Sequence, residues 1–99
     1  MTTDPQRKGL TDPRPIRRTD VTVHELDGEA LVFDATSCDT HRLNDTALFI
    51  WHRCDGRQDA RRVAEQLAGA YDISPDSAFE HVERMFGEFQ ARRLVVTAD

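Results

Sequence analysis

Short runs that alternate between apolar and polar residues occupy the first half of the chain. Residues 21–26 are β-branched and partly alternating, and Asp27-Gly28 follows them at once. This dipeptide between two such runs is a strong signal for a hairpin turn. Residues 30–33 then form a second apolar run, and residues 34–39 are mostly polar. The pattern predicts a β-hairpin, a looser turn and a short third strand over residues 40–43, in which His41 and Leu43 share one face.

From residue 44 onward the apolar residues recur at helical spacing, which predicts three helices. Asn44, Asp59 and Ser74 are candidate N-caps, and Pro75 suits the first position of the third helix. Gly56 is expected to take the left-handed position that closes the first helix. The stripes expected in the core are Leu43, Ala47, Ile50, Trp51 and Cys54, then Ala60, Val63, Ala64, Leu67 and Tyr71, then Ala78, Phe79, Val82, Met85, Phe86 and Phe89.

The predicted order β-β-β-α-α-α defines an α+β domain in which a three-stranded antiparallel sheet precedes three helices. A hairpin beside two helices joined by a short turn is the outline of a winged helix-turn-helix. Residues 94–96 end the fold as an apolar tail or a short strand. Residues 1–15 hold three prolines and several charges, so we expect a disordered N-terminal tail there and a folded domain over residues 16–97.

Charge is distributed unevenly along the 99 residues. The first 20 residues carry five basic and three acidic side chains, whereas the remainder carries eight basic and fifteen acidic ones, a balance of −7. Nucleic-acid domains usually have the opposite sign, because phosphate neutralisation drives their affinity. A winged-helix DNA-binding regulator, with Arg53, Arg57, Arg61 and Arg62 near the second helix, is therefore the alternative and not the preferred interpretation.

Two cysteines and four histidines are the candidates for metal or catalytic chemistry. Cys38, His41, His52 and Cys54 could form a tetrahedral zinc site, but the spacing of the second pair is unusual for structural zinc. We therefore expect reduced thiols, no metal and no cofactor. No phosphate loop, nucleophile elbow or zinc-protease motif is present, so we do not expect an enzyme. The chain has neither a membrane-spanning run nor a signal-peptide stretch, so we expect a cytoplasmic protein without a membrane partner.

A succession of short motifs resembles a known family. Its elements are Leu43-Asn44, Ala47, Ile50-Trp51, Asp55-Gly56, Val63-Ala64, Leu67, Tyr71-Asp72, Ser74-Pro75 and Leu94-Val95. In this order and spacing they are similar to the PqqD-like family, the leader-peptide recognition elements of ribosomally made, modified peptides. The resemblance covers about residues 16–96. One departure is Arg93, where the family often has glycine, so we expect the last helix to end differently here.

The resemblance implies a non-catalytic peptide chaperone that presents a precursor to a modifying enzyme, often a radical iron–sulfur enzyme. An extended leader peptide would add to the edge of the third strand and lie against the third helix. An unpaired edge strand has free N–H and C=O groups for this purpose, and also for a second copy of the chain, so monomer and dimer both stay open. The expected peptide-binding residues are Thr40, His41, Arg42 and Leu43 on the strand and Met85, Phe89 and Arg92 on the helix. Sequence alone does not decide whether the helix turns His81, Met85 and Arg92, or instead Phe79, Phe86 and Arg93, toward the peptide.

Overall fold

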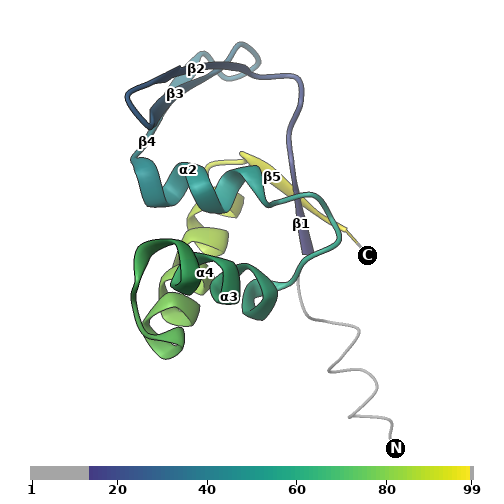
Figure 1. The fold of residues 1–99 in the computed structure, drawn as a ribbon. Helices are drawn as coiled ribbons and strands as arrows, with labels where there is room; N and C mark the ends of the chain where they lie inside the picture. The colour runs from purple at the N-terminus through teal and green to yellow at the C-terminus, as the bar shows by residue number, and fades with distance from the viewer. Residues whose placement is uncertain (1–13, 99) are drawn as a thin grey trace, which may run out of the picture.

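The computed structural model describes residues 14–98 of the chain. A three-stranded sheet lies at one end, helices lie beneath it, and a two-stranded ribbon of β1 and β5 lies beside the helices (Figure 1). The elements are β1 Arg14–Arg17, β2 Thr22–Leu26, β3 Glu29–Asp34, β4 Asp39–Leu43, α2 Asp45–His52, α3 Ala60–Tyr71, α4 Pro75–Ala91 and β5 Val95–Ala98. The expected α+β fold, with three antiparallel strands followed by three helices, is confirmed. None of the helices in the described range is long and apolar enough to cross a membrane.

The three-stranded sheet has the order β2-β3-β4. Asp27 and Gly28 both have left-handed backbone angles, with φ of 56° and 80°. They form the two-residue turn of the β2–β3 hairpin and place Leu26 opposite Glu29. Two left-handed residues in succession match the right-handed twist of the flanking strands, which explains why Asp-Gly occurs at this turn.

The helices begin at the residues that the sequence indicates. Asn44, Asp59 and Ser74 are the N-caps, and the side chain of each accepts a hydrogen bond from the backbone N–H three residues further on. Each such cap satisfies an otherwise orphaned donor and stabilises the fold by about 1 kcal/mol. Pro75 occupies the start of α4, where its missing N–H has no cost.

The core lies where the sheet meets α2, and where α3 and α4 pack beneath it. Its members are all buried, and they are Ala30, Val32, Leu43, Ala47, Leu48, Ile50, Trp51, Cys54, Ala60, Val63, Ala64, Leu67, Ala78, Val82, Phe86, Phe89, Leu94 and Val95. The indole Nε1 of Trp51 donates to the Leu94 carbonyl at 3.1 Å and so ties α2 to the segment that enters β5. The predicted apolar stripes are thus largely the observed core.

The ribbon of β1 and β5 corrects the predicted boundary of the tail. Arg14 and Pro15, assigned to the disordered tail of residues 1–15, begin strand β1, and Pro15 is fully buried. β1 pairs antiparallel with β5, from Arg14 opposite Ala98 to Arg17 opposite Val95. The prolines and charges of this segment hide the strand, because its partner is about 80 residues away in the sequence. The rest of the predicted tail lies outside the described residues.

The first helix ends earlier than predicted. α2 stops at His52 and is capped by Arg53, so Gly56 does not close it and Cys54 follows the helix. Residues 54–56 instead lie along β1: the Arg17 N–H donates to the Cys54 carbonyl at 2.8 Å, and the Gly56 N–H to the Pro15 carbonyl at 3.0 Å. These long-range backbone bonds replace the hydrogen bonds that another helical turn would make.

The last helix ends in the left-handed conformation that glycine favours, even though the residue there is arginine. Arg93 has a φ of 58°, and the Leu94 N–H donates back to the Phe89 carbonyl at 2.8 Å. Arg93 thus takes the conformation that a glycine at this position would favour. The substitution of arginine for glycine leaves a backbone conformation that costs a non-glycine residue about 1–2 kcal/mol.

One arginine joins the sheet to the end of α4. Arg18 Nη1 donates to the Asp34 carboxylate at 2.7 Å and to the Arg93 carbonyl at 3.0 Å. Asp34 is a buried charged residue at the end of β3, with a side-chain exposure of 4%. The hydrogen bond from Arg18 holds the pKa of Asp34 below its usual range, so the carboxylate stays ionised and paired. Arg18 thereby fixes the sheet relative to α4.

Candidate functional site

The outer edge of β4 is unpaired within residues 14–98, since β4 has β3 as its only strand neighbour. The two-residue hairpin makes Leu26 and Glu29 a hydrogen-bonded pair, and backbone groups then point to alternate sides along each strand. Glu29, Leu31 and Phe33 of β3 therefore hydrogen-bond to β2. Ala30, Val32 and Asp34 hydrogen-bond to β4. The observed register then turns the N–H and C=O groups of Thr40 and Arg42 toward the free edge.

Side chains along β4 alternate between the two faces of the sheet. Leu43 points to the helices and is 1% exposed, and its backbone groups bond to Ala30 of β3, so it offers a bound peptide neither its side chain nor its backbone, and its place among the peptide-contacting residues is wrong. His41 lies on the same inner face and is half-buried, and its Nε2 is enclosed with no hydrogen-bond partner among the described residues. A buried polar atom left unpaired costs about 1–3 kcal/mol. Thr40 and Arg42 are exposed on the outer face, where Arg42 donates to Glu29 at 3.0 Å.

The α4 residues expected to face a peptide differ in their accessibility. Phe89 is 1% exposed and belongs to the core, so its place among the peptide-contacting residues is wrong. A helical aromatic residue packs inward when the helix lies on other helices, and α4 lies on α3. Met85 is half-buried and packs against the core from its margin. Arg92 is exposed and forms an ion pair with Glu88 at 3.5 Å.

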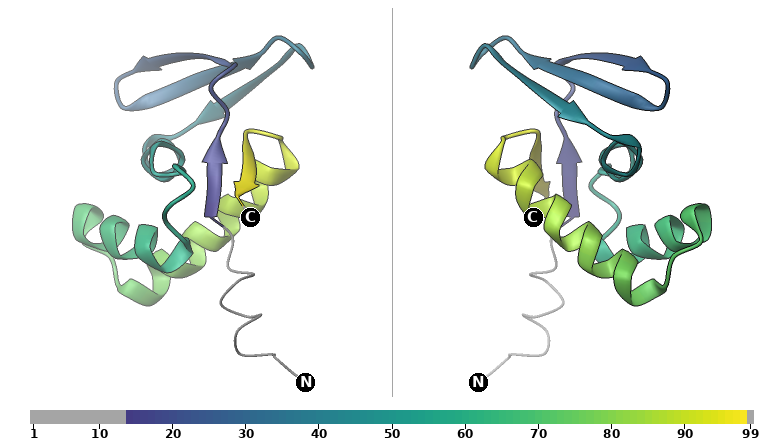
Figure 2. Two further views of the ribbon diagram at one scale, coloured as in Figure 1. Left: turned by 90° about the vertical axis from the view of Figure 1, so that its right-hand side faces the viewer. Right: turned by 90° about the vertical axis from the view of Figure 1, so that its left-hand side faces the viewer.

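Contacts distinguish the two sides of α4. His81 Nε2 lies 3.3 Å from Thr46 Oγ1, in the first turn of the helix that directly follows β4. On the other side, the guanidinium of Arg61 from α3 lies 4.8 Å from the centre of the Phe79 ring. The side of α4 that carries His81 therefore faces the β4–α2 junction, whereas Phe79 faces α3. In the right-hand view of Figure 2, β4 and α4 lie in front of β1 and β5.

β2 is the other edge of the three-stranded sheet. The same register turns the backbone groups of Val23 and Glu25 outward there. The Glu25 side chain is engaged with the helical body, since Glu25 Oε2 lies 3.0 Å from His52 Nε2. The β4 edge is the edge that continues directly into α2, whose first turn contacts α4 through Thr46 and His81.

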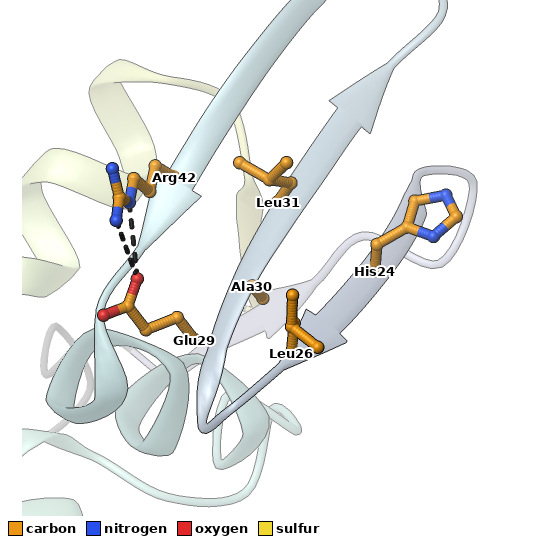
Figure 3. A pocket seen from close by; sticks show the side chains of 6 residues that line it. All are labelled: His24, Leu26, Glu29, Ala30, Leu31 and Arg42. Atoms are coloured by element: carbon orange, nitrogen blue, oxygen red, sulfur yellow. Dashed lines mark hydrogen bonds and ion pairs between the residues drawn. The ribbon is translucent and has the colours of Figure 1, made fainter.

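The outer face of the sheet carries a feature that the sequence analysis missed. Leu26, Leu31 and Phe33 are 75%, 49% and 39% exposed there. Beside them is an open hollow of about 320 Å³, and Figure 3 shows the Arg42–Glu29 ion pair at its rim. The hollow is lined by His24, Leu26, Glu29, Ala30, Leu31 and Arg42. Alternation along β3, which turns Ala30 and Val32 inward, was the available signal for this apolar face.

Cysteine and histidine side chains do not gather into a site in the described part of the chain. No group of three or more metal-ligating side chains is present within residues 14–98, so the zinc alternative gains no support. Burial raises the pKa of the Cys54 thiol to about 12, and its Sγ donates to the Ile50 carbonyl. This thiol is protonated at neutral pH and is a poor nucleophile. Cys38 is exposed at the β3–β4 turn.

Two of the arginines that favoured DNA binding are engaged within the protein. The Arg53 guanidinium lies 3.5 Å from the centre of the Phe49 ring and donates to Gln66 at 2.8 Å. Arg61 stacks on Phe79. The Arg53 guanidinium is occupied by these contacts, whereas Arg61 remains exposed, so the alternative of a DNA-binding regulator is weakened at Arg53 alone.

The fold and the open edge define a winged-helix-like α+β domain with an incomplete sheet. Residues 29–95 match the family model described as coenzyme PQQ synthesis protein D (PqqD), which is more than half of the chain. The protein therefore belongs to the PqqD family, and the resemblance inferred from its motifs is confirmed. No match was found among curated proteins.

Solved structures share the fold at low sequence identity. A structure of TbiB1 in complex with the TbiA(beta) leader peptide has a TM-score of 0.69 and 10% identity, over 80% of this chain and 92% of that one. A structure of lasso peptide synthetase B1 complexed with the leader peptide has a TM-score of 0.70 and 21% identity, over 87% of this chain and 99% of that one. At these identities the likeness establishes the common fold.

Proposed function

We propose that this protein is a non-catalytic chaperone that binds the leader of a ribosomally made precursor peptide by strand addition at β4. The observation that carries the proposal is the free edge of β4, where Thr40 and Arg42 direct unpaired backbone groups outward. An extended chain can satisfy such groups by continuing the sheet. Membership of the PqqD family supports the same function, as do two similar folds whose proteins were solved with leader peptides.

Backbone pairing alone does not give a useful affinity. The N–H and C=O groups of Thr40 and Arg42 allow up to about four hydrogen bonds, each worth roughly 0.5–1.5 kcal/mol net. Their sum of roughly 2–6 kcal/mol falls short of the ~8 kcal/mol of micromolar binding, before the cost of ordering a flexible peptide. Side-chain contacts must therefore supply the remainder and the selectivity.

We place those contacts on the side of α4 that faces the β4–α2 junction. His81 on this side contacts Thr46, and Met85 is half-buried at its margin. A methionine adapts its shape to different apolar partners, which suits a peptide groove wall. Arg92 offers a positive charge one turn beyond Glu88. Phe89 supports this wall from the core and does not contact the peptide.

The leader-bound protein would present the precursor to a modifying enzyme, of which radical iron–sulfur enzymes are the expected class, in the cytoplasm. Presentation requires that the enzyme contact a surface other than the β4 edge. The high pKa of Cys54 and the scattered histidines support a binding role without catalysis.

The test is a titration of isotope-labelled protein with a synthetic leader peptide encoded by the neighbouring short reading frame. We expect amide shifts at β4 and on α4, and a Kd at least tenfold weaker for Arg42→Pro, which removes the outward N–H. Arg42→Ala keeps this N–H and is the matched control, with an expected change below threefold. Proline is tolerated at edge strands, so the helix resonances should stay unchanged.

Two results would contradict the proposal. Shifts at Val23 and Glu25 without shifts at β4 would place the peptide at the other edge of the sheet. Equal affinities for Arg42→Pro and the unmodified protein would show that strand addition at β4 does not occur.

A further inference from the structure

One polar atom on the inner face of β4 has no hydrogen-bond partner among the residues that the structure describes. His41 Nε2 is enclosed and forms no hydrogen bond within residues 14–98. The other histidines differ: His52 pairs with Glu25 at 3.0 Å, and His81 contacts both Thr46 and Arg84. His24 is exposed to solvent on the opposite face of the sheet. Buried polar groups are nearly always paired in folded proteins, so His41 Nε2 is an exception that points to a partner outside the free domain.

The position of His41 relates it to the free edge. It lies between Thr40 and Arg42, the two residues whose backbone groups point outward. A strand added antiparallel to β4 at this edge, the orientation that this proposal assumes, would hydrogen-bond to these two neighbours. The peptide residue opposite His41 would then sit in a non-hydrogen-bonded pair, in which Cα atoms are about 4.5 Å apart and the side chains approach most closely. Both side chains of such a pair project from the same face of the sheet.

We propose that His41 is a specificity-determining residue that selects a hydroxyl or amide side chain at the leader position directly opposite it. This proposal rests on strand addition at β4 and adds the chemistry of one leader position. Because Nε2 is enclosed in the free protein, the ring must turn toward the added strand to form this pair. A hydroxyl or amide group both donates and accepts, so it pairs with Nε2 whether or not that nitrogen carries a hydrogen. An aliphatic side chain at this position leaves Nε2 unpaired in the complex.

The experiment measures Kd for leader peptides in which single polar residues are replaced by apolar residues of similar shape: Thr by Val, Ser by Ala, Asn by Leu and Tyr by Phe. The unmodified protein should bind about tenfold more weakly when the residue opposite His41 is replaced. His41→Phe should bind the original and replaced peptides within twofold of each other. The matched control His24→Phe changes the same side chain on the outer face and should keep the tenfold discrimination.

A measurement on the unmodified protein does not depend on the folding of any variant. The ¹⁵N resonance of His41 Nε2 should move when the leader is added and should stay in place with the peptide that has an apolar residue opposite. Backbone shifts at β4 combined with an unmoved ring resonance, or with equal affinity for both peptides, would overturn the role of His41 alone. A leader that causes no backbone shift at β4 would overturn strand addition itself, and the role of His41 with it.

Discussion

The three-stranded sheet and the helical body contain similar apolar residues, but they expose these residues to solvent to different degrees. In the body, Ile50 and Leu67 are fully buried, and the helices cover one another. In the sheet, Leu26 is 75% exposed and Leu31 is 49% exposed, and one edge carries unpaired backbone groups. Elements that open onto solvent in this way contribute little to stability and are where binding surfaces are usually found. The difference teaches that this small domain is stabilised by its helices, the β1–β5 ribbon and the inner face of the sheet, while the outer face and the β4 edge remain available for a partner.

The largest expected difference is in the reactivity of the two thiols. Cys38 is exposed at the β3–β4 turn, whereas Cys54 is buried in the body with a pKa of about 12. At pH 8 we expect Cys54 to react with a chromogenic disulfide reagent roughly a thousandfold more slowly than Cys38, because it must wait for unfolding. Cys38→Ser isolates the slow reaction. Similar rates for both thiols would mean that the body opens as readily as the sheet.

The next largest effect is expected from truncating large apolar side chains in the two regions. Phe89→Ala should lower the free energy of unfolding by about 3–5 kcal/mol, since the ring is 1% exposed and its removal leaves a cavity. Leu26→Ala should change it by less than about 0.5 kcal/mol, because that side chain already contacts water. Urea denaturation measures both values. A large loss for Leu26→Ala would show that the outer face of the sheet is a stabilising surface.

The smallest effect concerns the left-handed residue in each region. Gly28→Ala in the hairpin turn should destabilise the protein by about 1 kcal/mol, because φ there is 80°. Arg93→Gly at the end of α4 should stabilise it by about 0.5–1 kcal/mol by relieving the same strain at a φ of 58°. Both are measured by urea denaturation. A loss of stability in Arg93→Gly would show that the arginine side chain offsets the strain of its backbone.

The elements that were predictable are those whose signals are local. Asn44, Asp59 and Ser74 cap helices because their side chains reach an N–H three residues away, and Asp27-Gly28 makes its turn with two adjacent residues. β1 and the early end of α2 could not be predicted, since each depends on backbone partners far away in the chain. A segment with proline and charge becomes a strand when β5 and residues 54–56 meet it on both sides.

The features of the candidate site also divide into those that local sequence signals predict and those that depend on tertiary contacts. Alternation along residues 40–43 predicts the edge strand. The sequence does not show which side of α4 faces the β4–α2 junction, and the contacts of His81 with Thr46 and of Phe79 with Arg61 identify that side. Periodicity placed Phe89 on the correct stripe but could not say whether that stripe is sealed by α3. The family resemblance came from the order of short motifs, and the family model agrees with it.

The sequence by itself determined the order of the elements, their caps, the hairpin and the family, because each of these depends on residues within a few positions of one another or on their order along the chain. Only the tertiary structure decided which edge of β4 is free, which residues around it are accessible, and that His41 Nε2 has no partner within residues 14–98. Exposure and hydrogen bonding depend on which distant segments pack against a side chain, and the local pattern of apolar and polar residues does not predict those segments.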